Sequence, residues 1–107
     1  MRISGRLENY AEGAPNLRKW AVVAQELNID WDECPFRDDL KQVCQYDDLA
    51  IILWYLYRER ALIWATTSIP ELDNLTVRRL LTDLAGYSVL RGYLAQNSRL
   101  KHTIVKV

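Results

Sequence analysis

The sequence predicts a mainly α-helical protein, and three observations support this prediction. Residues 49–65 (LAIILWYLYRERALIWA) hold fourteen apolar side chains in seventeen positions, so they are expected to form a central helix. In the segments around this run, apolar residues recur at spacings of three and four, as in amphipathic helices. Half of the chain is hydrophobic, and glycine and proline are scarce, so we expect order except at the ends. We therefore expect one domain, residues 1–107, built as a bundle of four or five helices.

The first helix is expected to begin at Pro15 and Asn16. Proline suits the first helical turn, and asparagine is a good N-cap because its side chain can accept from a free backbone N–H. The apolar residues that follow lie on one stripe: Leu17, Trp20, Ala21, Ala24 and Leu27. This pattern predicts an amphipathic helix.

A second helix is expected to begin at Asp30 or Asp32, with Pro35 still early enough to be tolerated. Its apolar residues recur at i, i+4, i+7 and i+8: Phe36, Leu40, Val43 and Cys44. The spacing predicts a helix of about three turns.

The central helix is expected to start at Asp47 or Asp48 and to run unbroken from Leu49 to Thr66, where Ser68, Ile69 and Pro70 stop it. A hairpin is the alternative, but Arg58-Glu59-Arg60 lacks the Gly, Asn or Asp of a tight reversal. The same three charges would cost about 8 kcal/mol at a bilayer centre, which disfavours a membrane span. The opening residues also lack the apolar stretch of a signal peptide, so we expect a soluble cytoplasmic protein.

The C-terminal half is expected to hold two more helices. The first begins at Asn74 or Thr76 and carries the stripe Val77, Leu80, Leu81 and Leu84; Gly86 ends or bends it. Residues 87–96 form the next helix. Residues 2–7 alternate in polarity and the tail LKHTIVKV is β-branched, so the two chain ends could pair as a short two-stranded ribbon.

The sequence argues against catalysis and cofactors. His102 is the only imidazole, no Gly-rich phosphate loop exists, and the cysteines, Cys34 and Cys44, form no metal-binding motif and are expected to be reduced. The acids after Asp30 do not fit a calcium loop, because Pro35 and Lys41 stand where glycine and glutamate are required. We expect no enzyme activity, no metal, no cofactor and no small-molecule substrate.

Charge is unevenly distributed along a chain whose net charge is zero. Residues 1–57 hold six basic and ten acidic side chains, a balance of −4, and residues 58–107 hold eight basic and four acidic, a balance of +4. This distribution has two interpretations: the acids neutralise the basic half within the fold, or they face a basic partner. Under the second interpretation, Asp38 and Asp39 point outward and contact that partner.

Aromatic side chains suggest a protein partner. The chain has four Trp, six Tyr and one Phe, more than a small helical core easily encloses. Because Trp and Tyr often anchor protein interfaces, we expect Trp54, Tyr55, Tyr57 and Leu62 to contact another protein or a second copy of the chain, as in a homodimer. Arg60, on the face that carries Leu53 and Leu56, is expected to be buried and paired.

A nucleic-acid-binding function is the alternative. In residues 76–97 (TVRRLLTDLAGYSVLRGYLAQN), the motif Ala85-Gly86-Tyr87-Ser88 between two helical patterns resembles the turn of helix-turn-helix proteins, over about a fifth of the chain. This resemblance implies phosphate contacts by Arg78, Arg79, Arg91, Arg99 and Lys101. The sequence pI of about 6.6 lacks the basic character of such domains. Our main interpretation is therefore a non-enzymatic protein-binding module, such as an inhibitor, an immunity protein or an assembly subunit.

Overall fold

The computed structural model describes residues 4–107, and this part of the chain is helical, with no strand. The α-helices are α1 (Gly5–Glu12), α2 (Leu17–Glu26), α3 (Arg37–Cys44), α4 (Asp47–Tyr57), α5 (Ala61–Thr66), α6 (Val77–Leu80), α7 (Leu84–Ala95) and α8 (Ser98–Lys106). Short 3₁₀ turns are η1 (Asn28–Glu33), η2 (Arg58–Arg60) and η3 (Pro70–Leu72). The mainly α prediction is confirmed, but four or five helices was too few.

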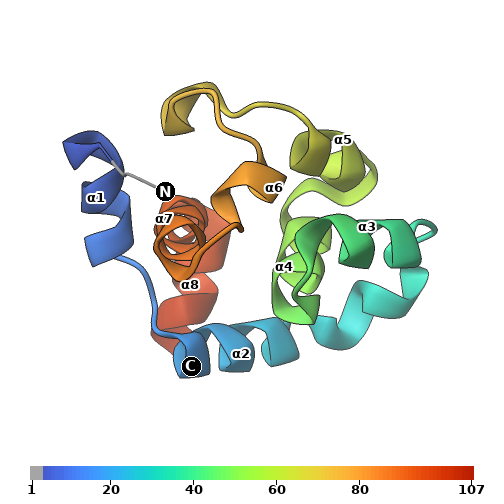
Figure 1. The fold of residues 1–107 in the computed structure, drawn as a ribbon. Coiled ribbons are helices and arrows are strands. Elements are labelled where there is room, and N and C mark those ends of the chain that lie inside the picture. The colour runs from blue at the N-terminus through green and yellow to red at the C-terminus, as the bar shows by residue number, and fades with distance from the viewer. Residues whose placement is uncertain (1–3) are drawn as a thin grey trace.

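Two helices, α4 and α7, organise the packing (Figure 1). Helix α7 packs against α1, α6 and α8, and α4 packs against α2, α3 and α5. Helix α6 also contacts α3 and α5, which joins the two groups. The described part measures 37 × 29 × 20 Å.

The central apolar stretch is broken rather than continuous. Helix α4 ends at Tyr57, and Arg58 adopts φ 49° and ψ −123°, which turns the backbone out of the helix. Helix α5 then packs against α3 and α4. The prediction of one helix from Leu49 to Thr66 was wrong because the three charged residues form the corner between two helices.

This break changes the environment of the charged residues. Arg60 is exposed, so the prediction that it is buried and paired was wrong. Among the described residues, the arginine that is buried is Arg91, with only 6% of its surface exposed. Its Nε donates to the carbonyl of Pro15 at 3.1 Å and its Nη2 to the hydroxyl of Ser88 at 3.2 Å, and its guanidinium lies 4.5 Å from the ring centre of Tyr87.

Local capping explains several helix starts. Asn16 caps α2 by accepting from the N–H of Lys19 at 2.8 Å, and Thr76 caps α6 by accepting from Arg79, as the sequence predicted. The second predicted helix starts later than expected. Residues 28–33 form η1, and α3 begins at Arg37, so Asp38 and Asp39 occupy its first turn.

Both chain ends are helical where the structure describes them. Ser4 caps α1 by accepting from Leu7, and residues 98–106 form α8. The two-stranded ribbon is therefore not present in residues 4–107, while Arg2 and Ile3 lie outside the described residues. A strand was expected at residues 2–7 because alternating polarity over only six residues does not distinguish a strand from one face of a short helix.

Two glycines allow close helix packing. A Cβ at Gly92 would overlap the carbonyl oxygen of Tyr10, and one at Gly86 would overlap that of Leu80. Gly86 was expected to end or bend a helix, but it lies inside α7. Gly92 lets α1 lie directly against α7.

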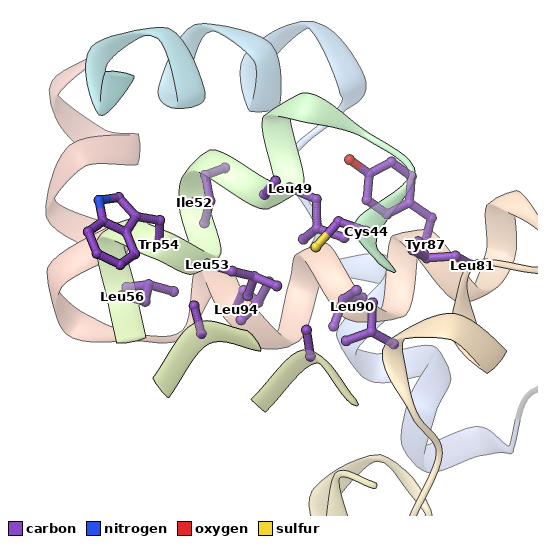
Figure 2. Packing of buried hydrophobic residues seen from close by; sticks show 14 of the residues in the cluster. Cys44, Leu49, Ile52, Leu53, Trp54, Leu56, Leu81, Tyr87, Leu90 and Leu94 are labelled. Carbon is purple, nitrogen blue, oxygen red and sulfur yellow. The ribbon is translucent and has the colours of Figure 1, made fainter. Parts of the chain in front are cut away.

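The core lies between α4 and α7, with side chains from most other helices (Figure 2). Leu49 and Leu53 of α4 and Leu90 and Leu94 of α7 are almost completely buried. Both cysteines are free and buried, and burial raises the pKa of the Cys44 thiol to about 12. Within residues 4–107, no helix combines the length and the apolar character needed to cross a bilayer.

Candidate partner-binding surface

Trp54, one of the expected contact residues, is part of the core. Only 5% of its surface is exposed, and its Nε1 donates to the carbonyl of Asp30 at 3.0 Å. The ring of Phe36 meets it edge-on with centres 5.6 Å apart, and the Arg58 guanidinium lies 5.4 Å from its ring centre. Trp54 thus joins α4 to η1 and leaves little surface for a partner.

Tyr55 and Leu62 also have contacts within the chain. Tyr55 is half-buried, with the guanidinium of Arg99 4.8 Å from its ring centre, which links α4 to the first turn of α8. Leu62 is half-buried on α5 and packs against the core. The broken helix explains this arrangement, because neighbouring helices cover α4 on several sides.

Tyr57 has a different environment, at the edge of an open hollow. Its ring stacks on that of Trp64, with centres 4.8 Å apart and planes 16° apart. The hollow, of about 210 Å³, is lined by Tyr57, Tyr93, Leu94, Gln96 and Asn97. We call it the Tyr57–Tyr93 cleft. It lies where α4 ends and where α7 meets α8.

Tyr93, which belongs to α7, lines another part of the cleft. Its ring meets that of Tyr10 edge-on, with centres 5.5 Å apart and planes 80° apart, so α1 helps to hold it in place. Tyr57, Tyr93 and Tyr10 are all half-buried. Each therefore packs on another aromatic ring and stays partly accessible to solvent.

Burial and one nearby carboxylate act on the tyrosines of the cleft. Burial, together with Tyr93 and the carboxylate of Glu71, raises the pKa of Tyr57 to about 12. Burial and the same carboxylate also raise the pKa of Tyr93. Glu71 is exposed on η3, and its charge acts on both phenols. Sequence reasoning found Tyr57 but missed Tyr93 and Glu71, because the three residues come from distant segments.

The acidic segment is only partly neutralised within the fold. Asp30 pairs with Arg58 at 2.9 Å, Asp32 with Arg37 at 2.7 Å and Asp47 with Lys41 at 3.7 Å. Asp38 and Asp39 are exposed in the first turn of α3, and neither forms an ion pair with another residue in 4–107. They border a hollow of about 330 Å³ that Cys34, Pro35, Phe36 and Arg37 also line.

The arrangement around α7 differs from the helix-turn-helix expectation. Residues 85–88, expected to form the turn, lie within α7, and the connection after α6 is residues 81–83. Seven of the twelve residues of α7 are buried, so this helix faces its neighbours rather than a groove. The turn was misplaced because Gly86 is required for packing, not for a reversal.

The five basic residues proposed for phosphate contacts do not form one group. Arg78 and Arg79 are exposed on α6, Arg99 and Lys101 are exposed on α8, and Arg91 is buried. Helix α6 packs against α3, α5 and α7, whereas α8 packs against α2 and α7. The exposed pairs therefore belong to different parts of the fold.

A third hollow, of about 390 Å³, lies between α3, α5 and α6 and is lined mainly by uncharged side chains, with Arg78 at its edge. In residues 4–107, no three His, Cys, Asp or Glu side chains gather closely enough to hold a metal ion. Comparison of the chain with protein-family models, with curated proteins and with solved structures finds no match.

Proposed function

We propose that this protein is a non-enzymatic module that binds another protein through the Tyr57–Tyr93 cleft. The observation that carries the proposal is the half-exposed state of these two tyrosines beside an open hollow. Trp54 and Tyr55, by contrast, are occupied by partners from the same chain. Tyrosine is enriched at interfaces because its ring supplies apolar area while its hydroxyl stays wet.

The size of the cleft favours a protein side chain over a small-molecule ligand. Ligand pockets usually measure roughly 300–1,000 Å³, and the cleft measures about 210 Å³. A hollow of this size suits one inserted side chain, with the surrounding surface contacting the rest of the partner. An inhibitor, an immunity protein or an assembly subunit would act in this way, and a second copy of the chain is one candidate partner.

The exposed acids support a basic partner. Asp38 and Asp39 keep their charge facing solvent, whereas three neighbouring acids are paired within the chain. Such charges mainly accelerate the encounter with an oppositely charged protein. They would therefore raise the association rate and contribute less to the lifetime of the complex.

Filling the cleft tests this function without removing a core contact. Gln96 is exposed and lines the cleft, so Gln96→Trp should block it; Gln25→Trp, at an exposed position of α2, is the matched control. Each tagged variant is incubated with an extract of the source cells, and light scattering measures self-association. We expect a protein, or a second copy, to be held by wild type and by Gln25→Trp but lost from Gln96→Trp. If every bound protein is retained equally by all three, the proposal is wrong.

A further inference from the structure

Among residues 4–107, arginine side chains cover three aromatic rings. The pairs are Arg58 on Trp54 at 5.4 Å, Arg91 on Tyr87 at 4.5 Å and Arg99 on Tyr55 at 4.8 Å. A planar guanidinium stacks well on an aromatic face and is attracted by the negative charge of that face. Tyr57 and Tyr93 have no such cation over their rings within residues 4–107.

The cleft also has an acid beside it with no basic partner. Glu71 is exposed and forms no ion pair with another described residue. The carboxylate of Glu71 is near enough to both phenols to raise the pKa of Tyr57 and of Tyr93. The C-terminal end of α7 and the N-terminal end of α8 meet here, and their partial charges have opposite signs, whereas Glu71 brings a full negative charge.

We propose that the Tyr57–Tyr93 cleft receives an arginine side chain of the partner protein, with its guanidinium against the tyrosine rings and toward the Glu71 carboxylate. This inference rests on the proposed function and names the chemistry recognised at the same site. Two tyrosine rings at the cleft, a nearby carboxylate that forms no ion pair with another described residue, and the absence of a covering cation among residues 4–107 together support it.

The test uses small probes that share a butyl chain and differ in the charge or the shape of the head group. Butylguanidinium and its uncharged isostere butylurea are titrated into the full chain, and the ring resonances of Tyr57 and Tyr93 are followed by NMR. Butylammonium tests whether the planar group is required. The variants are Glu71→Gln and the matched control Glu59→Gln, because both glutamates are exposed and neither forms an ion pair with another described residue.

We expect butylguanidinium to shift both rings and to bind at least about fivefold more tightly than butylurea and butylammonium. Glu71→Gln should weaken this binding about three- to fivefold, the range of one exposed ion pair, and Glu59→Gln should leave it unchanged. Equal binding of guanidinium and urea, equal binding of guanidinium and ammonium, or equal binding by wild type and Glu71→Gln would each overturn the inference.

The same variants separate this inference from the proposed function. A partner that is lost from Gln96→Trp but held equally by wild type and Glu71→Gln would leave the cleft as a binding site and reject arginine as its occupant. If instead no bound protein depends on Gln96, the proposed function fails, whatever the small probes show.

Discussion

The carboxylate of Asp30 lies 2.9 Å from the guanidinium of Arg58, across twenty-eight positions of the chain. The same guanidinium covers the ring of Trp54, whose Nε1 donates to the backbone carbonyl of Asp30. These three residues connect η1 to the corner at which the central apolar stretch breaks. Within residues 49–65, Arg58 thus has the left-handed backbone conformation, and its side chain also holds the corner in place.

Replacing Arg58 should separate its two roles. Arg58→Ala loses the ion pair with Asp30 and the contact with Trp54, which should lower the unfolding free energy by about 1–2 kcal/mol. Arg58→Gly loses the same contacts but tolerates φ 49° and ψ −123°, a region that favours glycine. We therefore expect Arg58→Gly to be the more stable variant in urea unfolding. A less stable glycine variant would mean that this backbone conformation carries no strain.

Gly92→Ala tests the packing of α1 on α7. The added methyl would overlap the Tyr10 carbonyl, so α1 must shift, at a cost of about 1–3 kcal/mol. Gly5→Ala is the control, because a Cβ at Gly5 meets nothing within 4 Å. Urea unfolding should show a clear loss for Gly92→Ala and no loss for Gly5→Ala. Equal stability of the two variants would contradict the close approach.

The two cysteines should be protected from thiol reagents in the folded protein. With the Cys44 pKa raised to about 12, only about one part in 10⁴ is thiolate at pH 8, and burial raises the pKa of Cys34 as well. Reaction with a disulfide reagent at pH 8 should be slow without urea and fast with it. In Cys44→Ser only Cys34 can react, and in Cys34→Ser only Cys44 can react, so the two variants report the two thiols separately. Rapid labelling of Cys44 in native buffer would show that it is accessible.

Stability should fall at alkaline pH because buried tyrosines resist ionisation. The pKa of Tyr57 is raised to about 12 from an ordinary value near 10, so the unfolded chain releases this proton first. The contribution is fully present below pH 10 and is lost as the pH rises from 10 to about 12. We expect the unfolding free energy to drop in this window and to drop less steeply in Tyr57→Phe. Parallel curves for the two proteins would exclude Tyr57 as a cause.

Neutralising the exposed acids should slow association with a basic partner. Once a partner is identified, Asp38→Asn with Asp39→Asn should lower the on-rate several-fold at low salt and change dissociation little. Above about 0.5 M salt, where the screening length is about 4 Å, the variant should match wild type. Glu8→Gln with Glu12→Gln removes the same charge from α1. If both double variants slow association equally, net charge rather than the start of α3 is responsible.

The helical class and several helix starts could be predicted from the sequence because their causes are local. Asn16 caps α2 through a neighbour three residues away, and the periodic positions Trp20, Ala24, Leu40 and Cys44 are buried as their spacing indicated. Periodicity was less reliable at helix ends. Leu17 belonged to a predicted stripe, yet half of its surface is exposed in the first turn of α2.

Tertiary packing decided where the central helix breaks and which residues form the cleft. The break at Arg58 is held by Asp30, from another segment, so no pattern within residues 49–65 reveals it. The cleft brings together Tyr57 of α4 and Tyr93 of α7, near Glu71 of η3. Gly92 allows α1 to pack closely on α7. Helix periodicity depends on neighbours within four residues, whereas corners, close approaches and clefts depend on contacts between segments far apart in the chain.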